Sequence, residues 1–134
     1  MLLDTGPLVA VLDARDQWHA RCLEVWPTVI ARCVTTEAVV AEACHLVARG
    51  GGAVSLALVF LLRAAIPIIG LPHDGQARAA LVMDRYADVP MDYADATLVA
   101  LAEALGTSRV FTTDRRGFAA YRLPGRRRFA LQPD

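Results

Sequence analysis

Short apolar runs alternate with longer helical patterns along the chain, and this alternation limits the possible folds more than any other feature. Runs at 2–3, 33–35, 66–69, 110–112 and 129–131 are short, apolar or β-branched, and predict strands. Apolar residues at helical spacing fill the intervals between them. The alternation predicts a three-layer α/β/α fold with a central, mainly parallel sheet and helices on both faces. Such sheets place their sites outside the carboxyl ends of the strands.

Capping residues, glycines and prolines predict where the helices begin and end. Pro7 suits the first turn of a short helix, and Asp16 is expected to cap a second helix that Pro27 bends or ends. Thr36 and Asp92 are expected to cap two longer helices, each closed by a glycine after its last turn. Further helices are expected at 53–65, 74–86 and 115–121.

Size and composition suit one globular unit. The chain has 134 residues, of which 55% are hydrophobic and 21% charged, so we expect a single domain over 1–134. The most apolar stretch, 53–71, is interrupted by Arg63 and Pro67, so a membrane span is not expected. The three cysteines are odd in number and form no CxxC pair, which favours the reducing cytoplasm.

Four acidic residues occupy positions where a parallel sheet builds its site. Asp4 directly follows the first predicted strand, and Asp114 directly follows the strand at 110–112. Asp95 lies in the first turn of the helix that Asp92 opens. Glu42 lies inside a helix among alanines and valines, where a buried carboxylate is costly unless a cation compensates it.

Each aspartate also has a purely structural interpretation. Asp4 could form an Asx turn before Pro7, and Asp114 could cap the short helix after it. Asp92 and Asp95 could be a helix cap and a first-turn acid favoured by the helix dipole. For Asp92 we favour the cap, with a supporting role at the site as the alternative.

The functional interpretation of these acids is collective. Three or four carboxylates at one sheet edge repel one another, and the arrangement persists best if a hard dication such as Mg²⁺ binds them through oxygen. A carboxylate-held Mg²⁺ can activate a water molecule and neutralise charge that builds on a phosphate. The chemistry that these acids favour is therefore phosphodiester hydrolysis.

The arginines suggest a nucleic-acid contact that the net charge of zero conceals. All 14 basic residues are arginine, and half of them lie between positions 109 and 128, where Asp114 is the only acid. Arginine binds phosphate in a bidentate manner. Arg115 and Arg116 are therefore predicted to approach the phosphate backbone of a nucleic acid beside the acids, although a solvated surface remains the alternative.

Four stretches in this order resemble the PIN domain, and more narrowly the VapC toxins of bacterial toxin–antitoxin pairs. They are Leu3-Asp4-Thr5, Val40-Ala41-Glu42, 92–102 with Asp-Tyr-Ala-Asp-Ala-Thr at its start, and 112–118 with Thr-Thr-Asp-Arg-Arg-Gly-Phe. The likeness extends from Leu3 to about Leu131. It implies an endoribonuclease that depends on Mg²⁺ or Mn²⁺, is usually dimeric, and is neutralised by a cognate, VapB-like antitoxin.

The resemblance also assigns roles to individual residues. Asp4, Glu42, Asp95 and Asp114 would form the acidic quartet, with Asp4 and Asp95 as the direct metal ligands. Thr5 and Thr112 would support the site by hydrogen bonding. Many relatives carry a further acid just after the last aspartate, whereas Arg115 follows here, which argues against a second tightly held metal.

One alternative function belongs to a different class. The chain could be a catalytically silent module on the same fold that binds nucleic acid or protein. The intact acidic quartet favours the enzyme, because a binder gains nothing from clustered negative charge that faces phosphate. The apolar stretch at 53–62 would leave exposed surface that predicts a homodimer.

Overall fold

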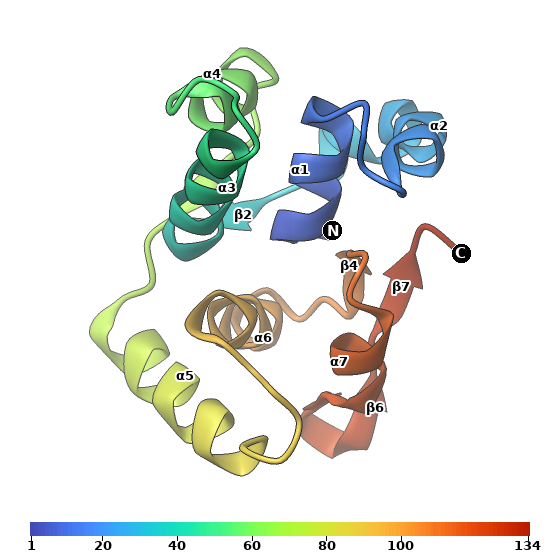
Figure 1. The fold of residues 1–134 in the computed structure, drawn as a ribbon. Helices are drawn as coiled ribbons and strands as arrows, with labels where there is room; N and C mark the ends of the chain where they lie inside the picture. The colour runs from blue at the N-terminus through green and yellow to red at the C-terminus, as the bar shows by residue number, and fades with distance from the viewer.

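A parallel sheet divides the computed structural model, which describes residues 1–134, into two helical layers (Figure 1). Strand β1 (Leu2–Leu3) pairs with β4 (Arg109–Phe111), which pairs with β7 (Ala130–Gln132). Strand β2 (Thr35–Thr36) pairs with β3 (Ile68–Ile69). All of these pairs are parallel.

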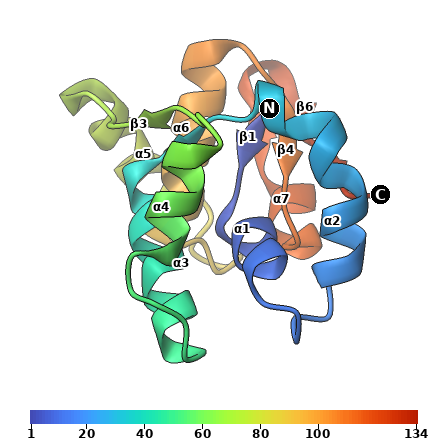
Figure 2. The ribbon, with the colours of Figure 1, turned by 90° about the horizontal axis from the view of Figure 1, so that it is seen from above.

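A bridge between Leu2 and Val34 joins the two sets of strands into the order β3-β2-β1-β4-β7. The backbone N–H of Leu3 donates to the carbonyl of Val34 at 2.8 Å, which ties β1 to the residue before β2. The chain order reverses between β1 and β4, which Figure 2 shows side by side. A reversal of this kind opens a crevice at the carboxyl ends of the two strands.

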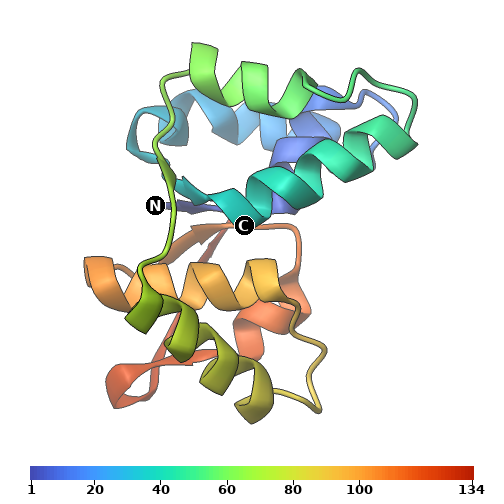
Figure 3. The same ribbon diagram turned by 90° about the vertical axis from the view of Figure 1, so that its left-hand side faces the viewer.

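Helices cover both faces of the sheet, as the alternation predicted (Figure 3). One layer contains α1 to α4 and the other contains α5 to α7. The helices are α1 (Thr5–Leu12), α2 (His19–Val29), α3 (Glu37–Arg49), α4 (Leu56–Arg63), α5 (His73–Arg85), α6 (Tyr93–Leu105) and α7 (Arg115–Ala120). A short 3-10 turn, η1 (Ile30–Arg32), follows α2.

Alternate strand residues build two separate cores because successive side chains of a strand point to opposite faces. Leu2 and Val110 belong to the core under α5 to α7. Their neighbours Leu3 and Phe111 belong to the core under α1 to α4. All four side chains are fully buried, so β1 and β4 are covered on both sides.

The predicted caps of the two long helices are confirmed. The Thr36 hydroxyl accepts a hydrogen bond from the N–H of Val39 at 3.4 Å at the start of α3. Asp92 caps α6, and Gly106 ends that helix in the left-handed conformation with φ 65°. The start of α6, with Asp92 and Asp95, borders the site, whereas α3 borders it with Glu42 and Leu46 from its middle.

The side-chain cap predicted for α2 was wrong. The helix begins at His19 without a side-chain cap, because the Asp16 carboxylate accepts from the N–H of Trp18 at 2.7 Å instead. Of the two effects predicted for Pro27, a bend or an end, the end is excluded, because α2 continues to Val29. Pro27 is exposed, and the neighbouring Trp26 ring packs 5.4 Å from Phe60, so tertiary packing holds the turn that lacks a backbone donor.

Some predicted boundaries were displaced, and one element was missed. The helix expected at 53–65 is confined to Leu56–Arg63, and the one expected at 74–86 begins at His73. An antiparallel hairpin of β5 (Arg122–Leu123) and β6 (Arg127–Arg128) precedes β7 and was not predicted. None of the helices combines the length and the apolar character that crossing a bilayer requires.

Candidate active site

A cleft of about 230 Å³ opens where β1 and β4 end. No basic residue lines it. The lining residues are Asp4, Thr5, Gly6, Glu42, Leu46, Asp92, Asp95, Thr113 and Asp114. The structure thus brings together all four predicted acids, although they come from β1, α3, α6 and the start of α7.

Asp4 is the most deeply buried of these acids, with 5% of its surface exposed. One carboxylate oxygen accepts from the N–H of Thr5 at 2.7 Å, and the other accepts from the Thr112 hydroxyl at 2.6 Å. The pKa of Asp4 is raised to about 6 despite these two hydrogen bonds, mainly by burial and to a smaller extent by the charges of Glu42 and Asp114. The Thr112 hydroxyl also accepts from the N–H of Asp114 at 2.9 Å, which couples the ends of β1 and β4.

Glu42 projects from the middle of α3 toward α1. Its carboxylate accepts from the Thr5 hydroxyl at 2.8 Å, so Thr5 holds two acids: Asp4 through its N–H and Glu42 through its side chain. Burial raises the pKa of Glu42, and the neighbouring charge of Asp92 acts in the same direction. No cation compensates this half-buried carboxylate.

Asp92 and Asp95 form a reciprocal capping box at the start of α6. The N–H of Asp95 donates to the Asp92 carboxylate at 2.9 Å, and the N–H of Asp92 donates to the Asp95 carboxylate at 3.3 Å. Burial raises the pKa of Asp95, and the charges of Asp4 and Asp92 add to the effect. The structural interpretation of these acids is therefore correct, and it also positions both of them at the cleft.

Tyr121 is a contact of the site that the sequence reasoning missed. Its side chain is fully buried, and its hydroxyl donates to the Asp95 carboxylate at 3.4 Å. Burial raises the pKa of Tyr121 far above its ordinary value, and the charges of Asp95 and Asp114 contribute, so the phenol keeps its proton. No local pattern could reveal this contact, because the two residues are 26 positions apart.

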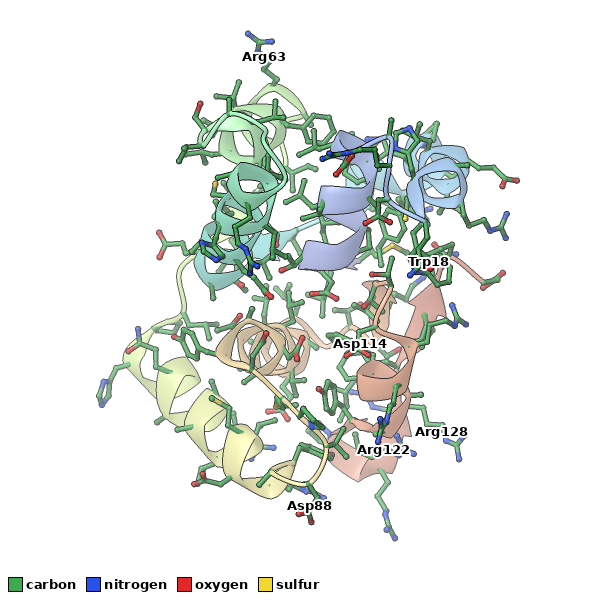
Figure 4. The ribbon with its side chains drawn as sticks, viewed as in Figure 1. Trp18, Arg63, Asp88, Asp114, Arg122 and Arg128 are labelled. Carbon is green, nitrogen blue, oxygen red and sulfur yellow. The ribbon has the colours of Figure 1, made fainter.

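Asp114 caps α7, where its carboxylate accepts from the N–H of Gly117 at 2.9 Å. Gly117 is required by close approach: a Cβ there would lie 2.1 Å from Asp114 Oδ2 and 2.8 Å from the Tyr121 hydroxyl. The acid and the glycine thus form one unit, and Asp114 faces the cleft in Figure 4.

The donor set fits a hard dication, because it offers carboxylate oxygens from several elements and no competing cation. The side chains do not converge on a common point as they stand, and no three of them form a closed set of ligands. Each carboxylate is instead held by hydrogen bonds to its own neighbourhood, so ligation of one ion requires side-chain rotation. Burial is the main cause of the raised pKa values of Asp4 and Asp95, and no basic side chain lines the cleft to offset it.

Arg115 and Arg116 occupy different environments. The Arg115 guanidinium donates to the carbonyl of Pro133, which ties α7 to the end of the chain. Arg116 is exposed, makes no hydrogen bond in the structure, and lines a small cavity of about 140 Å³ together with Asp114 and Pro90. Only Arg116 therefore combines a free guanidinium with a position beside the acids.

A family model described as the PIN domain matches residues 1–123, which is most of the chain. The chain belongs to the PIN domain family. This PIN domain is 35% identical over 136 aligned residues to Ribonuclease VapC26 of Mycobacterium tuberculosis (strain ATCC 25618 / H37Rv), with 99% of this chain and 100% of the relative covered.

Solved structures confirm the predicted fold. The crystal structure of M. tuberculosis VapC20, described as a sarcin-ricin loop cleaving toxin, matches this PIN domain with a TM-score of 0.75 at 21% identity, over 81% of this chain and 85% of that chain. A toxin–antitoxin complex from Klebsiella pneumoniae matches with a TM-score of 0.62 at 19% identity, over 92% of each chain.

Proposed function

We propose that the protein is a metal-dependent endoribonuclease and the toxin of a toxin–antitoxin pair. The observation that carries this proposal is the cleft at the ends of β1 and β4, where carboxylates from four elements meet without a cation. The 35% identical relative is named a ribonuclease, which supports RNA as the substrate. A binding module for nucleic acid would place positive charge, not these acids, in the cleft that receives the phosphates.

In this proposal Asp4 and Asp95 bind Mg²⁺ or Mn²⁺, with Asp114 and Glu42 completing the acidic quartet. A bound dication supplies an activated water molecule and neutralises the negative charge that builds on the scissile phosphate. The protein contributes orientation. Thr112 and the N–H of Thr5 fix the two oxygens of Asp4 at 2.6 and 2.7 Å, and the Thr5 hydroxyl fixes Glu42 at 2.8 Å.

Asp92 serves as a supporting residue. Its carboxylate caps α6 and fixes the first helical turn, so the backbone that carries Asp95 cannot shift without breaking the cap. The Tyr121 hydroxyl donates to the same Asp95 carboxylate and keeps its proton. Outer contacts of this kind set the orientation of metal ligands.

The partner in this proposal is an antitoxin, here a VapB-like protein in the cytoplasm. Helix α4 and the loop before it leave apolar side chains in solvent: Val54 is 72% exposed and Leu62 is 63% exposed. Exposed apolar surface of this kind is typical of an interface. The similar structure from K. pneumoniae is a toxin–antitoxin complex, which supports an antitoxin on this chain as well. A homodimer would bury part of the same apolar surface.

The test is RNA cleavage by purified protein. Total RNA is incubated with and without Mg²⁺ or Mn²⁺, and the cleaved ends are mapped. The wild type is expected to cut at defined positions only when metal is present, and Asp95→Asn is expected to lose cleavage. Asp88→Asn is the matched control, since Asp88 is an exposed acid far from Asp114 in Figure 4. Absence of metal-dependent cleavage by the wild type would overturn the proposal.

A further inference from the structure

We propose that the β5–β6 hairpin, residues 122–128, is a second RNA-binding surface that holds the phosphate backbone away from the cut. We call it the arginine hairpin. The inference rests on the proposed function, because it adds a second contact to the same substrate. It differs from the contact predicted for Arg115 and Arg116, which lie beside the acids.

The arginine hairpin carries positive charge that nothing in the protein neutralises. Arg126, Arg127 and Arg128 are consecutive and exposed, and none of them makes an ion pair. The ion pairs of the structure involve Arg15, Arg21 and Arg78 instead. No acid occurs between positions 115 and 133, so the sequence also places no counter-charge nearby.

The pairing within the hairpin brings like charges together. Arg122 is the direct cross-strand partner of Arg128, and like charges in that position oppose pairing. The Arg122 guanidinium is fixed in place, because it donates to the carbonyls of Ala119, Ala120 and Tyr121 at 2.7 to 2.8 Å. A phosphate between the two arginines would convert this repulsion into binding energy.

The turn of the hairpin holds one arginine in a strained conformation. Arg126 has φ 60° and follows Gly125, which has φ 73°. Residues other than glycine seldom adopt positive φ, and such strain is most often kept at functional positions. The hairpin turn itself uses positive φ at successive residues. Glycine or asparagine would adopt this conformation with less strain, yet the turn carries an exposed arginine whose guanidinium makes no hydrogen bond or ion pair.

The chemistry of the surface favours a polyanion over a protein partner. The exposed residues of the turn are Pro124, Gly125 and the three arginines, whereas the apolar Leu123 and Phe129 are buried in the core. A protein interface needs an apolar centre, which this surface lacks. Exposed arginines suit phosphate oxygens, which they bind without reading the sequence.

The arginine hairpin and the acidic cleft lie at opposite ends of the sheet. Strand β7 follows the hairpin and starts beside the amino end of β4, where the N–H of Ala130 donates to the carbonyl of Ser108 at 2.8 Å. Figures 2 and 3 show the hairpin at the end where β1 begins, away from the acids. Figure 4 shows Arg128 pointing away from the molecule. An RNA must therefore extend well beyond the cut to reach both.

The experiment measures RNA affinity against salt in a cleavage-dead Asp95→Asn background. The triple change Arg126→Ala, Arg127→Ala and Arg128→Ala should flatten the slope of log affinity against log salt by about 2, since each single-strand phosphate contact contributes roughly 0.7. The control triple Arg49→Ala, Arg63→Ala and Arg85→Ala removes the same charge from exposed sites on other helices and should leave the slope almost unchanged. An equal effect of both triples, or no effect of either, would refute the arginine hairpin as a binding surface.

Substrate length separates this inference from the proposed function. In the active protein, the hairpin triple should slow cleavage of a long RNA but not of an oligonucleotide too short to reach beyond the cleft. If the wild type cuts no RNA with metal, the nuclease proposal fails, while the salt slope still tests the hairpin. If the triple weakens binding of duplex DNA or of an acidic antitoxin segment but leaves RNA binding intact, the inference is wrong.

Arg126→Gly tests the strained residue by itself. Glycine relieves the positive φ, so the melting temperature should stay the same or rise, whereas the salt slope for RNA should fall by about 0.7. Arg126→Lys keeps both the charge and the strain and should largely preserve the slope. A loss of stability in Arg126→Gly with unchanged RNA binding would show a structural role for Arg126 and contradict the inference.

Discussion

The two ends of the sheet handle crowded charge in opposite ways. At the carboxyl end, acids from four elements share a cleft, and Asp4 is almost fully buried. At the amino end, the arginines of the hairpin project into solvent. Burial makes repulsion between carboxylates expensive, whereas water screens the arginines. Changes at the acids should therefore alter stability and chemistry together, and changes at the arginines should alter only affinity.

Hydrogen bonds to the backbone and to threonines are what keep the acidic end in place. Each carboxylate accepts at least one such bond, so the local fold holds the acids without a cation. The hairpin has no equivalent framework for Arg126 or Arg128. Like charges are therefore held in place by hydrogen bonds at the acidic end, whereas the side chains of Arg126 and Arg128 are unrestrained at the other end.

A glycine at each end gives the largest expected contrast. Gly117→Ala would place a Cβ 2.1 Å from Asp114 Oδ2, so it must displace that carboxylate, and cleavage should fall by at least about 10- to 100-fold, as when a metal ligand loses its support. Gly125→Ala meets no atom within 4 Å and should only strain the turn, at a cost of about 1 kcal/mol. The measurements are cleavage rate and chemical unfolding of both variants. Equal cleavage by the two would contradict the arrangement at Asp114.

In the metal-free protein, the crowded and buried acids should make the free energy of unfolding depend on pH. Since the pKa of Asp4 is raised from 3.8 to about 6, the folded state holds a proton that the unfolded state loses. The free energy of unfolding should therefore fall as pH rises from about 4 to about 6, by up to about 3 kcal/mol from this group. Glu42, Asp92, Asp95 and Asp114 also border the cleft and share its lack of cations.

Asp4→Asn provides the control for this pH effect, because it removes the titrating group. In chelator, the variant should match the wild type at pH 4 and exceed its stability at pH 7.5. Added Mg²⁺ or Mn²⁺ should raise the melting temperature of the wild type and raise it much less in the variant. A wild type that gains stability on raising the pH over this range, relative to Asp4→Asn, would show that the fold does not disfavour the charged form of Asp4.

The sequence predicted the cleft because the relevant information is local. Asp4 and Asp114 were placed by the strands they follow, and Asp92 by its position before a helical pattern. The parallel topology then brings these acids together, since parallel strands have their carboxyl ends at one edge of the sheet. Capping and a place at the site are not exclusive, since Asp92 and Asp95 both cap a helix and border the cleft.

What the sequence could not predict depends on contacts between distant elements. Tyr121 reaches Asp95 across the packing of α6 against the chain after α7, which no spacing rule encodes. The strands of the β5–β6 hairpin have two residues each, which is too short for an alternation of apolar and polar residues to be recognised in the sequence. Pro27 is tolerated in α2 because Trp26 packs on the core beside it. In each case tertiary packing overrides the local signal.

Thr112→Val sharpens the comparison at the acidic end. The change removes the hydroxyl that donates to Asp4 at 2.6 Å and accepts from the N–H of Asp114 at 2.9 Å. Buried groups left without a partner cost about 1–3 kcal/mol, and the pKa of Asp4 should rise further above about 6. Thr28→Val is the control, because the exposed Thr28 hydroxyl only donates to Val25 in its own helix. In denaturant unfolding at pH 7.5, Thr112→Val should lose more free energy of unfolding than Thr28→Val. A similar loss in both variants would contradict the role of Thr112 as a bridge between Asp4 and Asp114.

The smallest expected effect concerns Arg115 and Arg116, which begin α7 next to Asp114. Arg115 donates to the Pro133 carbonyl, whereas Arg116 is free beside Asp114. Arg116→Ala should therefore flatten the salt slope of RNA affinity by about 0.7 in the Asp95→Asn background, with little change in stability. Arg115→Ala should instead lower the melting temperature slightly, because it releases the end of the chain from α7, and leave the slope unchanged. If Arg115→Ala alters the slope and Arg116→Ala does not, Arg115 must leave Pro133 to bind RNA, and the contact beside the cut would form only when the substrate is present.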